Sequence, residues 1–395
     1  MSTEPNAPPK ATSSLPTLQW QSPEGEPRQA LWRSEAGVKP PAKVVLADDT
    51  LSADKAYKLV CEGTGLLWQG DYHQARQMLQ ALARRVDRKG TSKLAASAKE
   101  AFHQHRQKQA QKARVLGLVL LPFEADHSVP LRRAPDVREA CEAVWGPGRA
   151  PYVASLRELQ GLIGAHEWRK TGVEIPALKG RIHAHYGVFS PVRGEYVNLV
   201  AQASLPAAMA AGMEAASVAF DIGVGSGVLS AVLAQRGIEQ VVATDQDTRA
   251  LDCARANLTQ LGLIQQVSLQ QVDLFPAGRA PLVVCNPPWV PAKPSAPIEY
   301  AVYDPDSRML KGFLSGLREH LSEGGEGWLI LSDLAEHLGL RTREELLGWV
   351  HAAGLKVLGR LDAKPHHPKA SDPGDPLHQA RAREVTSLWR LGSCD

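Results

Sequence analysis

Cysteine is sparse in this sequence and forms no recognisable framework. The chain of 395 residues has five cysteines, an odd number, at scattered positions without a C-x-x-C spacing. This pattern argues against a disulfide scaffold and against a cysteine zinc site. His183 and His185, and the pair His366 and His367, have no Cys or acidic partners at the spacing of metal ligands. The sequence therefore predicts no metal site and a reducing, cytoplasmic environment.

Long hydrophobic runs are also lacking. The first residues, MSTEPNAPPKATSSLPT, do not contain the apolar core of a secretory signal. Residues 215–234 are nearly all apolar, but they include Asp221 and three glycines. Such a stretch fits a buried strand and turn better than a membrane span. We therefore expect a protein that has no membrane partner.

The composition and the apolar spacing change along the chain, which indicates its domain organisation. Residues 1–43 are rich in Pro, Ser, Thr and Glu and lack apolar periodicity, so we expect a disordered tail. Residues 44–150 contain two segments with helical apolar spacing, a polar helix-favouring stretch and one strand-like run. They predict a mainly helical, basic accessory domain. Residues 151–215 are interpreted as a connecting segment before a C-terminal domain over 216–395.

Short apolar strands alternate with helical segments from about residue 174. Strand-like runs fall at residues 219–224, 240–245, 267–273, 281–285 and 327–332. The helical segments between them end near Gly237, Gly262 and Gly354, where helix C-caps are expected. This alternation predicts an α/β fold with a parallel sheet covered on both faces. Residues 356–361 and 384–391 are expected to pair as a closing hairpin.

A glycine-rich turn follows the first of these strands and reads Asp221-Ile-Gly-Val-Gly-Ser-Gly227. A dinucleotide loop would need glycine or alanine where Val228 stands, and a phosphate loop would need a lysine that is missing. Two further acids, Asp245 and Asp273, close the next two strand-like runs. An acid about 20 residues after such a turn binds ribose hydroxyls in related α/β sites. The pattern predicts a ligand with an ammonium group, a ribose diol and an adenine amine, but no phosphate.

These residues resemble the motifs of class I methyltransferases, across roughly residues 180–395. The glycine turn with Asp221 matches the first motif, Asp245 the second and Asp273 the third. The resemblance implies a Rossmann-like, seven-stranded sheet that is mostly parallel with an antiparallel last strand. It also implies S-adenosylmethionine as the cofactor. The residues implied to bind it are Asp221, Gly223, Gly225, Gly227, Asp245, Asp273, Leu274 and Asn286.

The motif Asn286-Pro287-Pro288-Trp289 follows the fourth strand-like run. Proline lacks a backbone N–H and restricts the residue before it, so the strand must end at Asn286. The motif resembles the [DNS]-P-P-[YFWH] signature of amino-methyltransferases, which implies that these four residues are catalytic. The Asn286 side-chain oxygen and the Pro287 carbonyl would each accept one N–H of a planar –NH2 group, and Trp289 would stack on the substrate. The proline-rich segment that follows, residues 290–306, is a candidate for substrate contact.

The N-P-P-[YFW] form is shared by enzymes that methylate guanine N2 in rRNA, adenine N6 in RNA and glutamine N5 in proteins. Residues 76–114 hold eleven Lys or Arg against two acids, a net charge of +9, whereas the whole chain is +3. A basic helical arm is typical of phosphate-backbone binding. Arg84, Arg85, Arg88 and Lys89 are the candidate RNA contacts. We therefore expect an N-methyltransferase that acts on an exocyclic base amine in RNA, specifically rRNA.

Two alternatives remain open. Residues 187–202, GVFSPVRGEYVNLVAQ, resemble the segment before the first motif in glutamine methyltransferases of release factors and ribosomal proteins, which implies cofactor contacts by Phe189 and Pro191. On this alternative the substrate is a protein glutamine in a translation-related partner. The other alternative is a non-catalytic protein that binds RNA or a ribosome-assembly partner on a methyltransferase scaffold.

Overall fold

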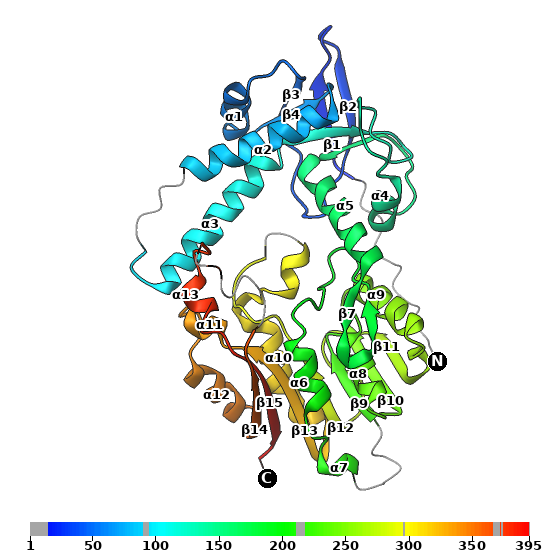
Figure 1. The fold of residues 1–395 in the computed structure, drawn as a ribbon, viewed down its shortest axis with the longest axis vertical. Coiled ribbons are helices and arrows are strands. Elements are labelled where there is room, and N and C mark those ends of the chain that lie inside the picture. Colours follow the sequence, from blue (N-terminus) through cyan, green and yellow to red (C-terminus); the bar gives the residue numbers. More distant parts are fainter. Residues whose placement is uncertain are drawn as a thin grey trace, which may run out of the picture. The chain divides into compact units, whose positions relative to one another are not determined.

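The computed structural model describes residues 15–89, 95–210, 218–294, 297–365, 372 and 374–394 (Figure 1). The chain forms two compact units. The N-terminal unit comprises Met1–Thr91 and Gln109–Ile163, and the C-terminal unit comprises Ser92–Lys108 and Gly164–Asp395. Helix α3 (Ala98–Leu116) therefore contributes residues to both units.

The N-terminal unit contains a six-stranded sheet in the order β1-β2-β6-β5-β4-β3. Its strands are β1 (Thr17–Gln21), β2 (Pro27–Trp32), β3 (Lys43–Ala47), β4 (Thr64–Trp68), β5 (Val119–Phe123) and β6 (Tyr152–Ser155). Strands β3, β4 and β5 run parallel, and β6 is antiparallel to β5. The accompanying helices are α1 (Ala53–Cys61), α2 (Tyr72–Lys89), α3, α4 (Arg138–Trp145) and α5 (Leu156–Thr171).

This sheet corrects the expectation of a mainly helical accessory domain. Strand β4 was missed because its five residues, TGLLW, are all buried, so the run lacks the alternation that separates a strand from a helix. The expected tail over residues 1–43 is also wrong in part, because β1 and β2 form an antiparallel hairpin there. Residues 1–14 lie outside the described residues. The expected connecting segment over 151–215 instead begins with β6 and α5.

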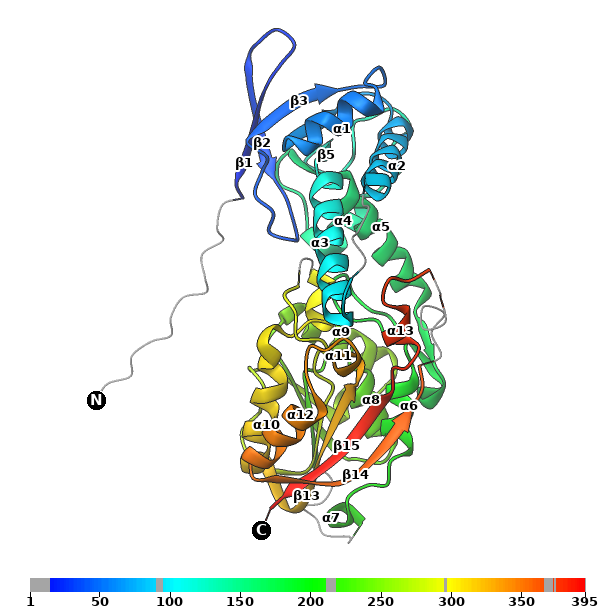
Figure 2. The same ribbon diagram turned by 90° about the vertical axis from the view of Figure 1, so that its left-hand side faces the viewer.

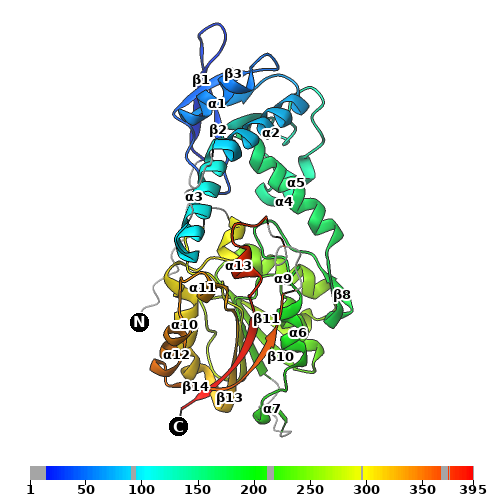
Figure 3. The same cartoon turned by 60° about the vertical axis from the view of Figure 1, so that its left-hand side comes forward.

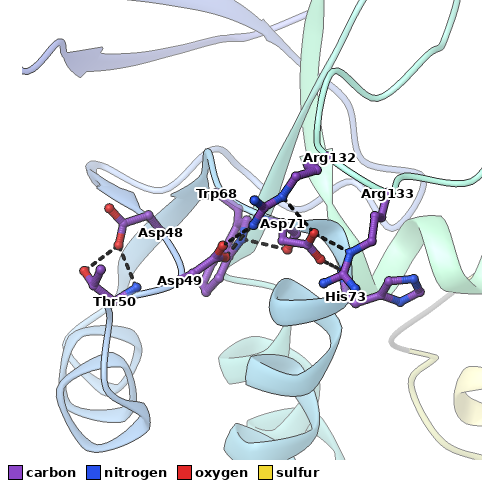
Figure 4. Close-up of polar contacts among 8 residues, drawn as sticks. All are labelled: Asp48, Asp49, Thr50, Trp68, Asp71, His73, Arg132 and Arg133. Carbon is purple, nitrogen blue, oxygen red and sulfur yellow. Dashed lines mark hydrogen bonds and ion pairs between the residues drawn. The ribbon is translucent and has the colours of Figure 1, made fainter.

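A buried carboxylate ties together the loops that follow β4 and β5 (Figure 4). The side chain of Asp71 is fully buried, and its Oδ2 accepts from Nε of Arg132 at 3.1 Å and Nε of Arg133 at 2.6 Å. Its Oδ1 accepts from the backbone N–H of His73 at 2.8 Å, at the start of α2. A buried charge is tolerated when it is paired in this way, so the network fixes these loops against the sheet.

The C-terminal unit contains a seven-stranded sheet in the order β11-β10-β9-β12-β13-β15-β14. Its strands are β9 (Val218–Ile222), β10 (Gln240–Asp245), β11 (Val267–Gln271), β12 (Ala280–Cys285), β13 (Leu321–Ser332), β14 (Leu355–Ala363) and β15 (Thr386–Ser393). The first five in this order are parallel, and β15 lies antiparallel between β13 and β14 (Figure 2). The expected seven-stranded sheet with an antiparallel last strand and a closing hairpin is confirmed.

Helices cover both faces of this sheet (Figure 3). One layer holds α6 (Glu195–Gln202), α8 (Val228–Gln235) and α9 (Thr248–Gln260), and the other holds α10 (Arg308–His320) and α12 (Arg343–Ala352). Side chains alternate along each strand. In β12, Leu282 and Val284 therefore pack under the first helix layer, while Val283 and Cys285 pack under the second. This double burial explains why the strands read as continuous apolar runs.

The remaining elements of the C-terminal unit are short. They include β7 (Val173–Ile175), β8 (Gly180–Ile182), α7 (Ala207–Ala210), α11 (Leu334–His337) and α13 (His378–Arg381). Gly237, Gly262 and Gly354 all have positive φ angles directly after helices, as the capping pattern predicts. Across the described ranges, no helix combines the length and apolarity needed to cross a membrane.

Candidate active site

The candidate site residues gather at the carboxyl edge of the parallel strands. Asp221 lies in β9, the glycine turn follows it, Asp245 ends β10 and Asn286 comes directly after β12. Because β10, β9 and β12 are neighbours in the sheet, their carboxyl ends meet at one edge. The topology therefore brings together residues that are up to 65 positions apart in the sequence.

The glycine turn requires glycine for two reasons. Gly223, Gly225 and Gly227 have φ angles of +80°, +51° and +82°, a region that side chains disfavour. A Cβ on Gly223 would lie 2.7 Å from Cε of Met309, and one on Gly227 would lie 3.1 Å from Cα of Ala254. The backbone N–H of Gly223 donates to the Thr244 carbonyl at 2.9 Å, which holds the turn against β10.

Asp245 presents a fixed, half-buried carboxylate beside this turn. Its Oδ2 accepts from the backbone N–H of Gly225 at 3.2 Å, and its Oδ1 accepts from that of Asp247 at 2.9 Å. Burial raises the pKa of Asp245, and these backbone donors oppose the rise. Each oxygen has a further lone pair for a hydroxyl donor, as a ribose-binding acid requires.

Asp221 has a structural role inside the fold. Its side chain is buried, and its Oδ2 accepts from Oγ of Ser230 at 2.5 Å. Burial raises the pKa of Asp221 to about 6, although the hydroxyl bond from Ser230 lowers it. Since Ser230 lies in α8, Asp221 links β9 to the helix on the other side of the glycine turn.

The third predicted acid lies beyond its strand. Strand β11 ends at Gln271, so Asp273 stands two residues later, which corrects its expected place at the strand end. Nη2 of Arg308 donates to Asp273 Oδ2 at 2.6 Å in a half-exposed ion pair. Leu274 has a φ angle of +68°, and its carbonyl accepts from the Thr244 hydroxyl. The turn after β11 is thereby tied to β10, next to Asp245.

Asn286 and Trp289 contact each other across the two prolines. The indole Nε1 donates to the Asn286 Oδ1 at 2.9 Å. An indole nitrogen is only a donor, so the contact fixes which side of the amide carries the oxygen. That oxygen keeps a second lone pair, and no described donor is bonded to the neighbouring Pro287 carbonyl. The Asn286 side-chain oxygen and the carbonyl of the next residue are therefore two acceptors with free lone pairs directly after β12 among the described residues.

Arg193 lies outside the motif in sequence and packs near the Trp289 ring. Its Cζ lies 6.0 Å from the centroid of the Trp289 ring, and its guanidinium pairs with Glu384 at 2.9 and 3.0 Å. The Glu384 side chain is fully buried and also accepts from Oγ of Ser332 at 2.7 Å. Arg193 belongs to the segment that contains Phe189 and Pro191, whereas nothing in the sequence indicates Glu384 as its partner.

The segment after the motif closes on itself. The Val290 N–H donates to the Val302 carbonyl at 3.1 Å, and the Asp304 N–H donates to the Val290 carbonyl at 2.9 Å. The Asp304 carboxylate accepts from the N–H groups of Met309 and Leu310, both at 3.1 Å, at the start of α10. We call the described residues 290–294 and 297–304 the post-motif loop; residues 295–296 lie outside the described residues.

Replacing Trp289 with phenylalanine tests the indole contact. The aromatic ring remains, but the N–H that orients Asn286 is lost. We expect kcat to fall about tenfold, the equivalent of roughly one hydrogen bond, with the cofactor affinity unchanged. Steady-state kinetics and calorimetry on the same preparation measure both quantities. An unchanged kcat would show that Asn286 is held without the indole.

The basic arm, residues 76–114, has fewer cations that can contact phosphates than its net charge indicates. Three of its cations form ion pairs: Arg85 with Asp54, Lys112 with Asp87 and Arg106 with Glu299. Arg84 and Arg88 are exposed on α2. The side chain of Lys89 lies outside the described part of the chain.

Of the histidines singled out in the sequence, His183 makes a side-chain contact within the fold. Nδ1 of His183 lies 2.6 Å from the Arg169 carbonyl. Within the described ranges, no three His, Cys, Asp or Glu side chains cluster closely enough to hold a metal ion. His366 and His367 lie outside those ranges.

Known proteins match the C-terminal part of the chain. The sequence model of the methyltransferase small domain family matches residues 179–348. The release factor glutamine methyltransferase of Cereibacter sphaeroides is 29% identical over 161 residues, which covers 36% of this chain and 55% of that protein. The corresponding enzyme of Xylella fastidiosa is 28% identical over 242 residues, covering 55% and 79%. The ribosomal protein L11 methyltransferase of Symbiobacterium thermophilum is 30% identical over 138 residues, covering 34% and 42%.

The chain spans about half the length of the first of these relatives. The matched region contains the glycine turn, Asp245, Asp273 and the Asn-Pro-Pro-Trp motif. The glycine turn carries no lysine or arginine, and Asp245 offers carboxylate lone pairs beside it. This set of groups fits a ligand with a ribose diol and a positive charge, and it lacks cationic groups for a phosphate. The C-terminal unit is therefore a class I methyltransferase domain with S-adenosylmethionine as its cofactor.

Proposed function

We propose that this protein methylates the side-chain amide nitrogen of a glutamine in a protein of the translation machinery. The observation that carries the proposal is the pair of acceptors at the end of β12. The Asn286 Oδ1 is oriented by the Trp289 indole, and Pro287, the next residue, supplies a backbone carbonyl. Relatives named as release factor and ribosomal protein methyltransferases support the choice of substrate class.

The chemistry that these residues supply is positioning. The nitrogen of an amide is a poor nucleophile because its lone pair is delocalised into the carbonyl group. Two acceptors that each hold one N–H fix the nitrogen in one orientation and help its lone pair to localise. Trp289 offers a flat surface for the planar amide, and Arg193 steadies the ring. S-adenosylmethionine supplies an electrophilic methyl group when it is bound.

An exocyclic base amine in RNA is the second candidate, since it presents the same planar –NH2 group. The observation that favours it is the exposure of Arg84 and Arg88 on successive turns of α2, with no ion pair to any described residue. The ion pairs of Arg85, Arg106 and Lys112 leave fewer cations for phosphates, which makes RNA the weaker candidate.

A labelling experiment separates the two substrates. The protein is incubated with lysate and S-[methyl-³H]adenosylmethionine, and the product is divided between protease and nuclease digestion. Label that protease releases and that is recovered as N5-methylglutamine supports the proposal. Label that nuclease releases would contradict it in favour of RNA.

The double substitution of Arg84 and Arg88 with alanine gives an independent prediction. On a protein substrate, we expect kcat/KM to change less than about twofold, because exposed cations contribute little to the binding of an uncharged amide. If RNA is the substrate, the slope of log K against log salt should flatten by about 0.7–0.9 for each lost phosphate contact. A matched control replaces Arg28 and Arg138, which are exposed but paired with acids in the same unit.

A further inference from the structure

The first half of α3 is part of the C-terminal unit and packs beside the post-motif loop (Figure 2). Phe102 is buried in a cluster with Val290, Leu334, Leu338, Leu377 and Ala380. The Phe102 ring centroid lies 6.5 Å from that of Tyr303. Trp289 packs against the same cluster. A helix that precedes the matched family region by more than 60 residues thus contacts the segment next to the motif.

Arg106 makes the polar contacts between this helix and the loop. Its Nη1 and Nη2 donate to the two carboxylate oxygens of Glu299, both at 3.0 Å. Its Nη2 also donates to the Lys293 carbonyl at 2.8 Å, and its Cζ lies 4.2 Å from the Tyr303 ring centroid. A single guanidinium therefore holds both the outgoing and the returning arm of the loop.

This contact is partly shielded from water. The Arg106 and Glu299 side chains are 16% and 26% exposed. A forked arginine–carboxylate pair fixes direction as well as distance, which a lysine ammonium does not. Losing the arginine would leave Glu299 largely buried and without this partner, so the loop would rearrange.

The post-motif loop is linked to Asn286 and Pro287 through the backbone. Val290 directly follows Trp289, and its backbone bonds to Val302 and Asp304 close the loop. Displacement of the loop therefore moves the residue that carries the indole, and the indole orients Asn286. Tyr300, on the same loop, is 68% exposed, which leaves its ring available to a substrate.

We propose that Arg106 is a positioning residue that shapes the acceptor-substrate site by holding the post-motif loop. It touches no reacting atom and acts through Glu299, Tyr303 and the Lys293 carbonyl. This assignment rests on the proposed function, because it gives the loop the task of receiving the acceptor. On this proposal, the acceptor-substrate site of the methyltransferase domain includes support from residues 98–108, which lie outside the matched region.

The test replaces Arg106 with methionine, which keeps the length and apolar stem but removes the fork. Hydrogen exchange followed by mass spectrometry reports on peptides that cover residues 290–304. We expect exchange there to accelerate about tenfold or more, the scale of a lost charged hydrogen bond. KM for the acceptor should rise by a similar factor, while kcat should fall by less than the roughly tenfold loss expected for Trp289→Phe, because the indole N–H is kept. Arg106→Lys should recover part of both effects.

Controls separate this role from general destabilisation. Lys99→Met makes the same charge change at an exposed position of the same half-helix and should leave exchange and KM unchanged. S-adenosylmethionine affinity and the melting temperature should stay close to wild type in Arg106→Met. Unaltered exchange over 290–304, or a loss of cofactor affinity as large as the change in KM, would overturn the proposal. The exchange measurement needs no substrate, so it decides the role of Arg106 in the loop even if glutamine proves to be the wrong acceptor.

Discussion

Asn286→Ala is expected to abolish methyl transfer while S-adenosylmethionine still binds with nearly wild-type affinity. The substitution removes the oxygen that the Trp289 indole orients, and it leaves the Pro287 carbonyl as the single remaining acceptor. A planar amide held by one hydrogen bond can rotate, so its nitrogen no longer points steadily at the methyl donor. Loss of one preorganised hydrogen-bonding group typically lowers kcat by about 10²–10³-fold.

The measurement pairs single-turnover kinetics on the radiolabelled acceptor with calorimetric titration of the cofactor. Asn286→Asp is the matched variant, because it keeps the oxygen that accepts from the indole and adds a negative charge. It should retain more activity than the alanine variant. A wild-type kcat in Asn286→Ala would contradict the catalytic role of the motif.

Asp245→Ala should weaken S-adenosylmethionine binding by about 1–3 kcal/mol, a factor of roughly 5–150 in Kd. Two losses add here. The ribose hydroxyls lose a charged acceptor, and the N–H groups of Gly225 and Asp247 lose the oxygens that hold them. Because Gly225 lies in the glycine turn, the turn also becomes less ordered.

Isothermal titration calorimetry on the folded variants measures this change directly. Asp245→Asn keeps one carbonyl oxygen and should fall between wild type and alanine. Asp273→Asn makes the same change in charge at a half-exposed ion pair and should have a smaller effect. Equal affinities in wild type and Asp245→Ala would remove Asp245 from the cofactor site.

The C-terminal fold could be predicted because its signals are local. Its strands are buried on both faces and therefore read as short apolar runs, and the helices between them end at glycines with positive φ. The N-terminal sheet could not be predicted in the same way. The TGLLW segment carries no periodicity, and the neighbouring helices α1 and α2 dominate the pattern around it.

The sequence alone predicts which residues bind the cofactor and orient an amine, because glycine turns, strand-end acids and proline turns impose their chemistry over a few positions. Only the tertiary structure decided what supports them. Arg193 finds Glu384 and Arg106 finds Glu299 at the ends of separations of 191 and 193 residues. Such pairs leave no local pattern, since each depends on where the sheet and its loops bring distant segments together. The ion pairs of the basic arm leave no local pattern either, so only the tertiary structure shows which of its cations are paired with acids.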